Sequence, residues 1–308
     1  MLAYAARRLA ALPLTLFIIV TLAFAVVRSA PGGPFDAEQS LPPQVKANLE
    51  RAYGLDQPLA LQYVRYLRGV VHGDFGPSLR YRDLSVRELI AQGLPVSLTL
   101  GFCALLFALA GGLPLGILAA RRRGSVLDHG IMGLAVLGVA LPSFVTGPLL
   151  VLVFGLLLHW LPVAGWQGGN PAYLILPVIT LALPLLAYIA RLVRGSLLEV
   201  LQSDYIRAAR ARGLGSGRVI WRHALPAALL PVVSYLGPAT AFVVTGSLVV
   251  ETVFALPGTG RYLVDAAINR DYTLVMGMVI VYGLITLLCN LAADLTYGWL
   301  DPRIAHGD

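Results

Sequence analysis

Lysine is almost missing from this sequence of 308 residues, and that shortage excludes one class of protein at once. The single lysine, Lys46, has no Gly-x-x-x-x-Gly-Lys loop around it, so the chain is not itself a P-loop ATPase. The five histidines lack the spacing of metal ligands, and no Gly-x-Ser-x-Gly motif marks a nucleophilic serine. Basic residues interleaved with stacking aromatics are absent too, which argues against nucleic acid. We therefore expect a non-catalytic chain that binds no cofactor or metal.

Charged residues and cysteines are also few, and both shortages point to a membrane. Charged side chains make up 13% of the chain and hydrophobic ones 57%, with a mean hydropathy of +0.76. A soluble domain has roughly a quarter of its residues charged. The net charge of +7 comes from arginines at the ends of apolar runs, so anionic lipid headgroups are the expected partner. Cys103 and Cys289 lie inside apolar runs without a Cys-x-x-Cys partner and are interpreted as packed apolar side chains.

Six apolar runs are long enough to cross a bilayer as helices, and they predict an all-α integral membrane protein. The runs are Leu9–Val27, Val96–Ala120, Ile131–Leu158, Tyr173–Ile189, Leu229–Val250 and Leu274–Trp299. The first run exceeds the apolar core of a signal peptide, so we expect an uncleaved helix. Pro142 and Pro148 are predicted to kink the third run. The spacing of Gly112 and Gly116 would let the second run approach another helix closely.

Three parts of the chain differ in composition. Residues 1–28 hold the N-terminus and the first span, and residues 93–308 form a predicted core of five spans. Residues 29–92 form the one soluble-looking part, which we interpret as an extracytoplasmic cap containing two short helices that begin near prolines. At the end of this cap, Val86–Ala91 is predicted to be a further short helix on the membrane surface.

The placement of arginines predicts the orientation in the membrane. With the N-terminus in the cytoplasm, six spans return the C-terminus to the same side. The cytoplasmic side then carries Arg191, Arg194, Arg303 and the arginines of residues 7–8, 121–123 and 195–226, whereas the short outer loops carry only Arg261 and Arg270. We therefore expect both termini, and the segment 195–226 between the fourth and fifth spans, to face the cytoplasm.

The central segment, residues 195–226, is too polar to cross a bilayer and too long for a minimal connector. Its sequence is GSLLEVLQSDYIRAARARGLGSGRVIWRHALP. The pattern predicts a helix with one apolar face that ends at Gly213, because glycine tolerates a left-handed turn. A second short helix, Arg218–Leu225, is predicted to end at Pro226. Two interpretations remain open: a basic loop held at lipid headgroups, or a docking surface for a cytoplasmic protein.

Within the central segment lies a motif of three blocks: Arg207-Ala208-Ala209, Gly213, and His223-Ala224-Leu225-Pro226. This motif resembles the EAA loop of importer-type ABC permeases. Arg207 stands where that family usually has glutamate and His223 where it has isoleucine, and both departures resemble the peptide-importing branch, above all the B subunits of oligopeptide permeases. The resemblance continues through Arg7-Arg8, Ala30-Pro31-Gly32, His72–Ser78, Leu141–Phe144, Glu251–Gly258, Asn269–Tyr272 and Leu300–Arg303.

The resemblance implies a type I ABC importer permease in a bacterial inner membrane. In such importers two homologous permease subunits form the pathway and an extracytoplasmic binding protein delivers the peptide. Two ATPase subunits bind ATP and Mg²⁺, and each accepts a short helix of the permease in a groove. The docking residues that the resemblance implies are Asp204, Tyr205, Arg207, Ala208, Ala209, Arg210, Gly213 and His223. Asp204 is the acidic residue that would replace the missing glutamate.

The outer hairpin between the last two spans, Glu251–Asp271, offers a second group of candidates. Its polar residues are predicted to contact the substrate or the delivery protein, and an ordinary solvated hairpin is the equal alternative. The outer-mouth candidates are Glu251, Gly258, Arg261 and Asp271.

The substrate and the energy source leave alternatives open. Dipeptides, nickel chelates or glutathione would suit the same family as oligopeptides. A secondary transporter would depend on a proton gradient without ATP, and its usual internal repeats are not evident. A membrane-embedded enzyme would need a catalytic constellation, and the motifs above contain none.

Overall fold

The computed structural model describes residues 2–29, 42–81 and 83–300, and within these ranges the regular elements are helices apart from one isolated bridge between Pro77 and Ser85. The helices are α1 (Leu2–Ser29), α2 (Pro43–Ala52), α3 (Leu59–Val71), α4 (Val86–Arg121), α5 (Val126–Ala140), α6 (Ser143–Leu150), the π-helix η1 (Val151–Leu157), the 3₁₀-helix η2 (Gln167–Gly169), α7 (Pro171–Val200), α8 (Asp204–Ala211), α9 (Ser216–Arg218), the π-helix η3 (Val219–Ala224), α10 (Leu225–Ala228), α11 (Leu230–Val253), α12 (Thr259–Ile268) and α13 (Tyr272–Leu300). Four single helices are long and apolar enough to cross a bilayer, and counting two bent pairs as one span each gives up to six. The predicted all-α membrane class is confirmed.

The third predicted span consists of two helices that meet at 106°. The predicted bend at Pro142 is confirmed, whereas the one at Pro148 is not. Leu141, which follows α5, has ψ 116° because the ring of Pro142 disfavours the helical conformation in the residue before it. Pro148 lies inside α6, and the chain continues from there into η1 without a comparable break. Pro142 therefore determines where this span turns.

The second span is longer than predicted. α4 begins at Val86, so Val86–Ala91 forms its first turns and is not a separate surface helix. A capping box fixes this start: the Glu88 amide donates to Ser85 Oγ at 3.2 Å, and the Ser85 amide donates to Glu88 Oε2 at 2.7 Å. Pro95 and Pro114 lie inside the helix without ending it, as is common for prolines in membrane helices.

α4 and α7 share the most extensive helix contact in the core, and glycines make their approach possible. A Cβ atom on Gly116 would lie 2.6 Å from the carbonyl oxygen of Ala190 and 2.7 Å from Cβ of Val193. A Cβ atom on Gly112 would lie 2.9 Å from Cγ2 of Ile189. The glycine spacing that predicted close helix packing is confirmed.

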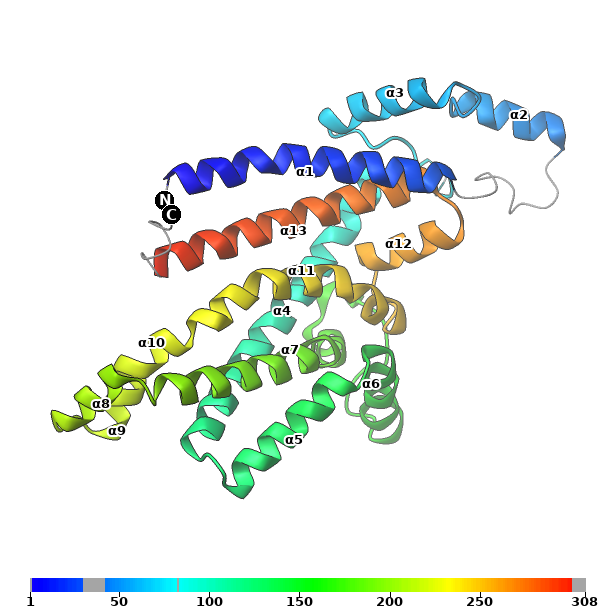
Figure 1. Cartoon of the computed structure of the whole chain (residues 1–308). Coiled ribbons are helices and arrows are strands. Elements are labelled where there is room, and N and C mark those ends of the chain that lie inside the picture. Colours follow the sequence, from blue (N-terminus) through cyan, green and yellow to red (C-terminus); the bar gives the residue numbers. More distant parts are fainter. Residues whose placement is uncertain (1, 30–41, 82, 301–308) are drawn as a thin grey trace.

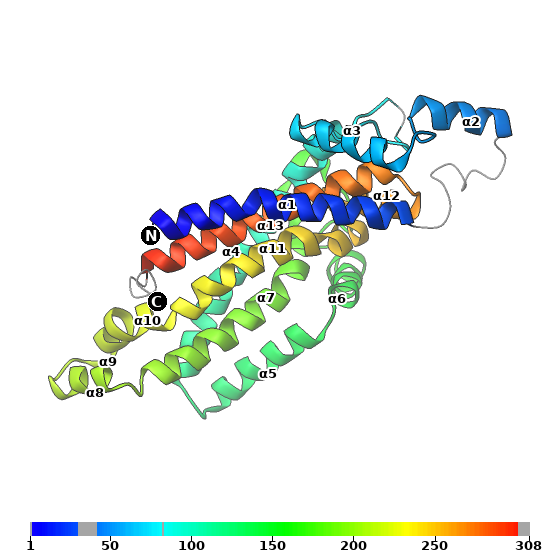
Figure 2. The same cartoon turned by 45° about the horizontal axis from the view of Figure 1, so that its top comes forward.

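The two ends of the helix bundle carry different elements, as Figures 1 and 2 show. α1 and α13 lie side by side, and α11 packs against α13. α8 and α9 project from one end, where α1 also begins and α13 ends. α2, α3 and α12 lie toward the opposite end. Because α8 and α9 belong to the central segment, that segment and the outer hairpin are separated by the length of the bundle.

The cap contains the two short helices that the sequence predicts. α2 and α3 follow Pro42 and Pro58, which both have extended ψ angles at the helix N-caps. Tyr63 packs α3 against α1. Its ring centroid lies 5.2 Å from that of Phe24, and its hydroxyl lies 2.7 Å from Thr21 Oγ1. Two blocks that carried the resemblance, Ala30-Pro31-Gly32 and Asp301-Pro302-Arg303, lie outside the described residues.

Candidate functional site

The central segment forms a compact turn of helices at one end of the bundle (Figure 1). α7 continues through Gly195 to Val200, and residues 201–203 separate it from α8. The predicted helix up to Gly213 is thus two helices. The second predicted helix also differs, because helical structure runs from α9 through η3 into α10 without stopping at Pro226. Pro226 is the second residue of α10 and follows the π-helix η3 closely, so it lies inside this helical run without ending it.

α8 has a buried face and an exposed face. Ile206 is fully buried and Ala209 is 9% exposed, and the helix packs against η3. Ile206 belongs to the same apolar cluster as Leu197 of α7 and Val219 of η3. The exposed face carries the predicted docking residues Asp204, Tyr205, Arg207, Ala208 and Arg210. The core therefore holds α8 firmly while its polar side stays open to a partner.

The C-terminus of α8 depends on the backbone of Gly213. This residue has φ +81°, and its amide donates to the carbonyl of Arg210 at 2.9 Å. A Cβ atom at Gly213 would meet no atom within 4 Å, so the glycine is required by conformation rather than by space. His223, the last predicted docking residue, is half-buried in η3, and its carbonyl accepts the Tyr205 hydroxyl at 3.5 Å.

Asp204, the predicted substitute for the glutamate of the family motif, makes a weak ion pair with Arg207. Its Oδ1 lies 3.5 Å from Nη1 of Arg207, and the two side chains are 95% and 71% exposed. Nη2 of Arg207 also donates to the carbonyl of Gln202 at 3.2 Å. An ion pair this exposed contributes about 0–1 kcal/mol. These charges are consequently available to pair with a docking partner at little cost.

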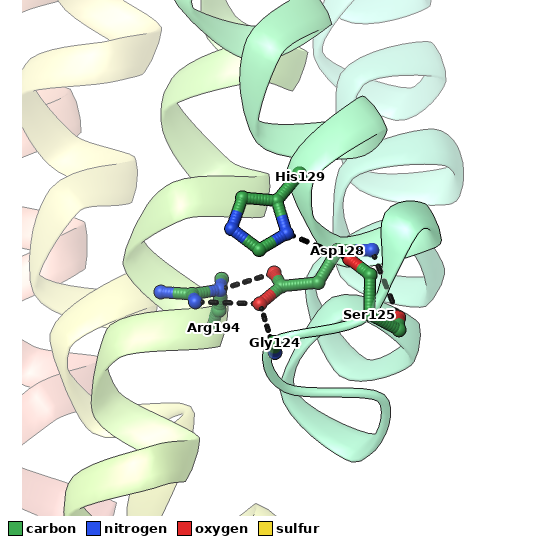
Figure 3. A network of polar contacts seen from close by, with 5 residues as sticks. All are labelled: Gly124, Ser125, Asp128, His129 and Arg194. Atoms are coloured by element: carbon green, nitrogen blue, oxygen red, sulfur yellow. Dashed lines mark hydrogen bonds and ion pairs between the residues drawn. The ribbon is translucent and has the colours of Figure 1, made fainter.

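A second Arg–Asp pair, at the base of the central segment, is buried (Figure 3). Arg194 near the end of α7 donates two hydrogen bonds to Asp128 in the first turn of α5, from Nε to Oδ1 at 2.6 Å and from Nη2 to Oδ2 at 2.7 Å. The Asp128 side chain is 2% exposed, and its Oδ2 also accepts the Gly124 amide at 2.9 Å. Ser125 Oγ accepts the Asp128 amide at 3.3 Å and so caps α5.

Sequence reasoning missed this pair. Arg194 was counted only as a positive charge on the cytoplasmic side, and Asp128 lies 66 positions away. The local signal was present, since Ser125 followed three residues later by Asp128 is typical of a helix N-terminus. Nothing in the sequence, however, indicates which arginine meets a capping aspartate.

At the opposite end of the molecule, Glu251 is the centre of a buried hydrogen-bond network. It is fully buried at the end of α11, and its Oε1 accepts the hydroxyls of Ser97 at 2.6 Å and Ser247 at 2.7 Å. Its Oε2 accepts the Gly260 amide of α12 at 2.8 Å. A Cβ atom on Gly258 would lie 2.3 Å from this oxygen, so the glycine leaves room for the carboxylate. Glu251 thus ties α4, α11 and α12 together.

Asp271 is also fully buried, and it joins the cap to α13. Its Oδ2 accepts the Ser78 hydroxyl at 2.5 Å and the Leu79 amide at 3.1 Å, while its Oδ1 accepts the Leu274 amide at 3.1 Å. Arg261 differs from the other outer-mouth candidates, because its side chain is 47% exposed and lies 4.0 Å from Asp265. Among these candidates, only Arg261 presents a charged side chain to the surroundings.

The two groups of candidates suit contact and support rather than bond-making chemistry. The exposed face of α8 offers charges and a tyrosine without a nucleophile–base arrangement, and the carboxylates of Glu251 and Asp271 already accept several hydrogen bonds each. In residues 2–29, 42–81 and 83–300, no three His, Cys, Asp or Glu side chains gather where they could hold a metal ion.

Comparison with known families agrees with this architecture. Residues 112–306 match the family described as "Binding-protein-dependent transport system inner membrane component", and residues 1–100 match its N-terminal counterpart, "Binding-prot-dependent transport system membrane comp, N-term". The chain belongs to this family. It is a multi-pass permease of the inner membrane and a non-catalytic component of an ABC transporter, which works with ATPase and binding-protein partners.

Individual relatives extend the match over nearly the whole permease. The oligopeptide transport system permease protein OppB of Escherichia coli (strain K12) is 49% identical over 300 residues, which cover 97% of this chain and 98% of the relative. The dipeptide transport system permease protein DppB of Bacillus subtilis (strain 168) is 42% identical over 98% of this chain and 97% of the relative. A chain of the MetNI methionine ABC transporter, in an inward-facing conformation, shares the fold with a TM-score of 0.55. It is 21% identical and covers 69% of this permease and 96% of its own length.

Proposed function

We propose that this permease is the oligopeptide-conducting subunit of an ATP-driven importer. It pairs with a second, homologous permease subunit, and the two form the pathway through the membrane. An extracytoplasmic peptide-binding protein delivers the peptide, and two ABC ATPase subunits dock on the cytoplasmic side. This chain binds no nucleotide or metal, so ATP and Mg²⁺ reside on the ATPase subunits. The 49% identity to permeases named for oligopeptide transport supports the substrate class.

The observation that carries the proposal is the exposed face of α8 on a buried anchor. Arg207 and Arg210 project from a helix whose other side is fixed by Ile206 and Ala209. Because the apolar face of α8 is anchored in the core, a force applied to its polar face by an ATPase subunit would be transmitted to the helices beneath it. Tyr205, 49% exposed, adds a large contact surface of the kind that is common in the centre of protein interfaces.

The path of the force into the membrane begins at the Asp128–Arg194 pair. α7 passes directly from the core to the central segment, and this pair joins its end to the start of α5. A bidentate pair with one buried partner fixes orientation as well as distance. A displacement that α8 passes to α7 through the apolar cluster shared by Ile206 and Leu197 would therefore carry α5 along with α7.

For the outer-mouth candidates we propose roles other than direct contact with the substrate. The buried carboxylates of Glu251 and Asp271 hold the outer hairpin and the cap in register with the spans. Arg261 is the candidate for contact with the binding protein, because its guanidinium is the exposed charge of this group.

The proposal is tested by reconstituting the permease with its copurifying subunits in liposomes. We expect the binding protein to stimulate ATP hydrolysis and labelled peptides of several residues to accumulate inside. Uptake that persists without ATP and follows a proton gradient would instead indicate a secondary transporter. Peptide cleavage by the isolated chain would indicate an enzyme.

A dipeptide importer is the second candidate, and the 42% identity to a permease named for dipeptide transport favours it. The same liposomes distinguish the two when peptides of increasing length compete for uptake. Preference for peptides longer than two residues supports the oligopeptide proposal. Competition by dipeptides alone, or by nickel chelates or glutathione, assigns the subunit to the corresponding substrate.

A further inference from the structure

A cavity of about 300 Å³ lies between the cap and the outer ends of two spans. α1 contributes Phe24 and Arg28 to its wall, and α13 contributes Thr273 and Met276. From the cap, α3 contributes Gln62 and Tyr66 among others. None of these residues belongs to the central segment or to the outer hairpin. The cavity adjoins Asp271, because the Thr273 hydroxyl donates to Asp271 Oδ1 at 3.0 Å and the amide of Leu79, another lining residue, donates to Asp271 Oδ2 at 3.1 Å.

The buried polar atoms that lack a hydrogen-bond partner gather at this cavity. Among the described residues these atoms are Arg28 Nε, Gln57 Oε1, Gln62 Oε1 and Tyr66 Oη. Arg28, Gln62 and Tyr66 line the cavity, and Gln57 lies beside the lining residue Gly54. Gln62 is only 9% exposed. Folded proteins rarely bury polar groups unpaired, so several at one cavity indicate an occupant that pairs with them.

The unpaired atoms specify the chemistry of that occupant. Arg28 and Tyr66 supply hydrogen-bond donors, and Arg28 has no described carboxylate partner; its guanidinium lies 5.6 Å from the Phe24 ring and 5.4 Å from the Tyr272 ring. Arg65 also lines the cavity. The one opposing charge in the lining is Asp74, which is exposed and already accepts the Gly76 amide at 2.9 Å. The lining is therefore net positive and attracts an anion.

The unpaired acceptor atom of Gln62 indicates a second group on the occupant. Gln62 donates through its amide nitrogen to the carbonyls of Leu55, at 3.0 Å, and Gln57, at 2.7 Å. This fixes the amide so that its oxygen is the atom left without a donor. A hydroxyl group on the occupant would supply the missing donor. The occupant thus combines an anionic group with hydroxyl groups.

We propose that this cavity binds a phosphoglycerol group, with the phosphate at Arg28 and Tyr66 and a glycerol hydroxyl at Gln62. Such a group occurs in the headgroup of an anionic lipid and in soluble glycerol phosphate. Its position favours the lipid, because the cavity lies at the outer ends of α1 and α13, the level of headgroups.

Native mass spectrometry of the full-length chain, purified with its accompanying subunits and stripped of lipid, tests the proposal. Phosphatidylglycerol, phosphatidylethanolamine and glycerol 1-phosphate are added separately. We expect phosphatidylglycerol to be retained more strongly than phosphatidylethanolamine. Arg28→Gln and Tyr66→Phe should each weaken retention about tenfold, as expected for loss of a charge-assisted hydrogen bond.

Arg68→Gln is the matched control, because Arg68 is exposed on the same helix α3 and does not line the cavity. It should retain the lipid as the unmodified chain does. Tyr66→Phe keeps the shape of the wall, so it remains informative if Arg28→Gln misfolds. Binding of glycerol 1-phosphate without the lipid would support the same site with a soluble source. Equal retention by Tyr66→Phe and Arg68→Gln, or binding of neither compound, would overturn the proposal and leave a cavity filled by water.

Discussion

Two Arg–Asp pairs lie in or next to the central segment, and their exposure to water determines how strongly each ion pair contributes. Asp204 and Arg207 are 95% and 71% exposed, and their single contact is 3.5 Å long. Asp128 is 2% exposed, and Arg194 meets it with two bonds of 2.6 and 2.7 Å. Screening makes the first pair weak. Removing one partner of the second leaves a charge that water reaches poorly.

At this residue scale we predict that Asp128→Asn lowers the free energy of unfolding by about 1–3 kcal/mol, because the half-buried Arg194 loses two short bonds to a charged partner. Asp204→Asn is the control and should change it by less than about 0.5 kcal/mol. The measurement is the thermal unfolding midpoint of the purified protein in detergent. Equal midpoints for the two variants would contradict the structural role given to the buried pair.

At the scale of helices, glycines decide which pairs approach closely. We predict that Gly116→Leu separates α4 from α7, because even its Cβ atom would lie 2.6 Å from the Ala190 carbonyl oxygen. Overpacking of this kind costs roughly 1–3 kcal/mol or more. The control is Gly130→Leu in α5, where a Cβ atom would meet nothing within 4 Å. Size-exclusion chromatography should show loss of the folded peak for Gly116→Leu only, and a normal peak for both variants would refute the prediction.

The prolines show which features of the helices the sequence predicts and which it does not. Hydropathy identifies the apolar runs because lipid selects for them along the chain. Yet Pro95 and Pro114 lie inside α4 and Pro148 inside α6, whereas Pro142 separates two helices at 106°. The same residue type thus has two outcomes, which depend on packing from other helices. The Asp128–Arg194 pair escaped prediction for a related reason, since its partners meet only after α5 and α7 have packed.

At the scale of the whole molecule, Gly213 links the conformation of one residue to transport. A side chain there is strained at φ +81° but meets no neighbour, so Gly213→Glu should leave the protein folded and inserted while it distorts the end of α8. We expect peptide uptake in reconstituted liposomes to fall at least tenfold. Gly213→Asn should retain most uptake, because asparagine tolerates left-handed backbone better than other residues do. Uptake unchanged in Gly213→Glu would show that the end of α8 carries no force.

The orientation of the bundle is the premise on which force transfer rests, and it is open to a direct test. Cys103 and Cys289 are half-buried in α4 and α13, so both should tolerate alanine and give a cysteine-free background. In that background we predict that Arg212→Cys reacts with a membrane-impermeant maleimide only from the cytoplasmic side, because arginine-rich short loops remain inside. Arg261→Cys, at the other end of the bundle, should react only from outside. Labelling of Arg212→Cys from outside would place α8 out of reach of any ATPase.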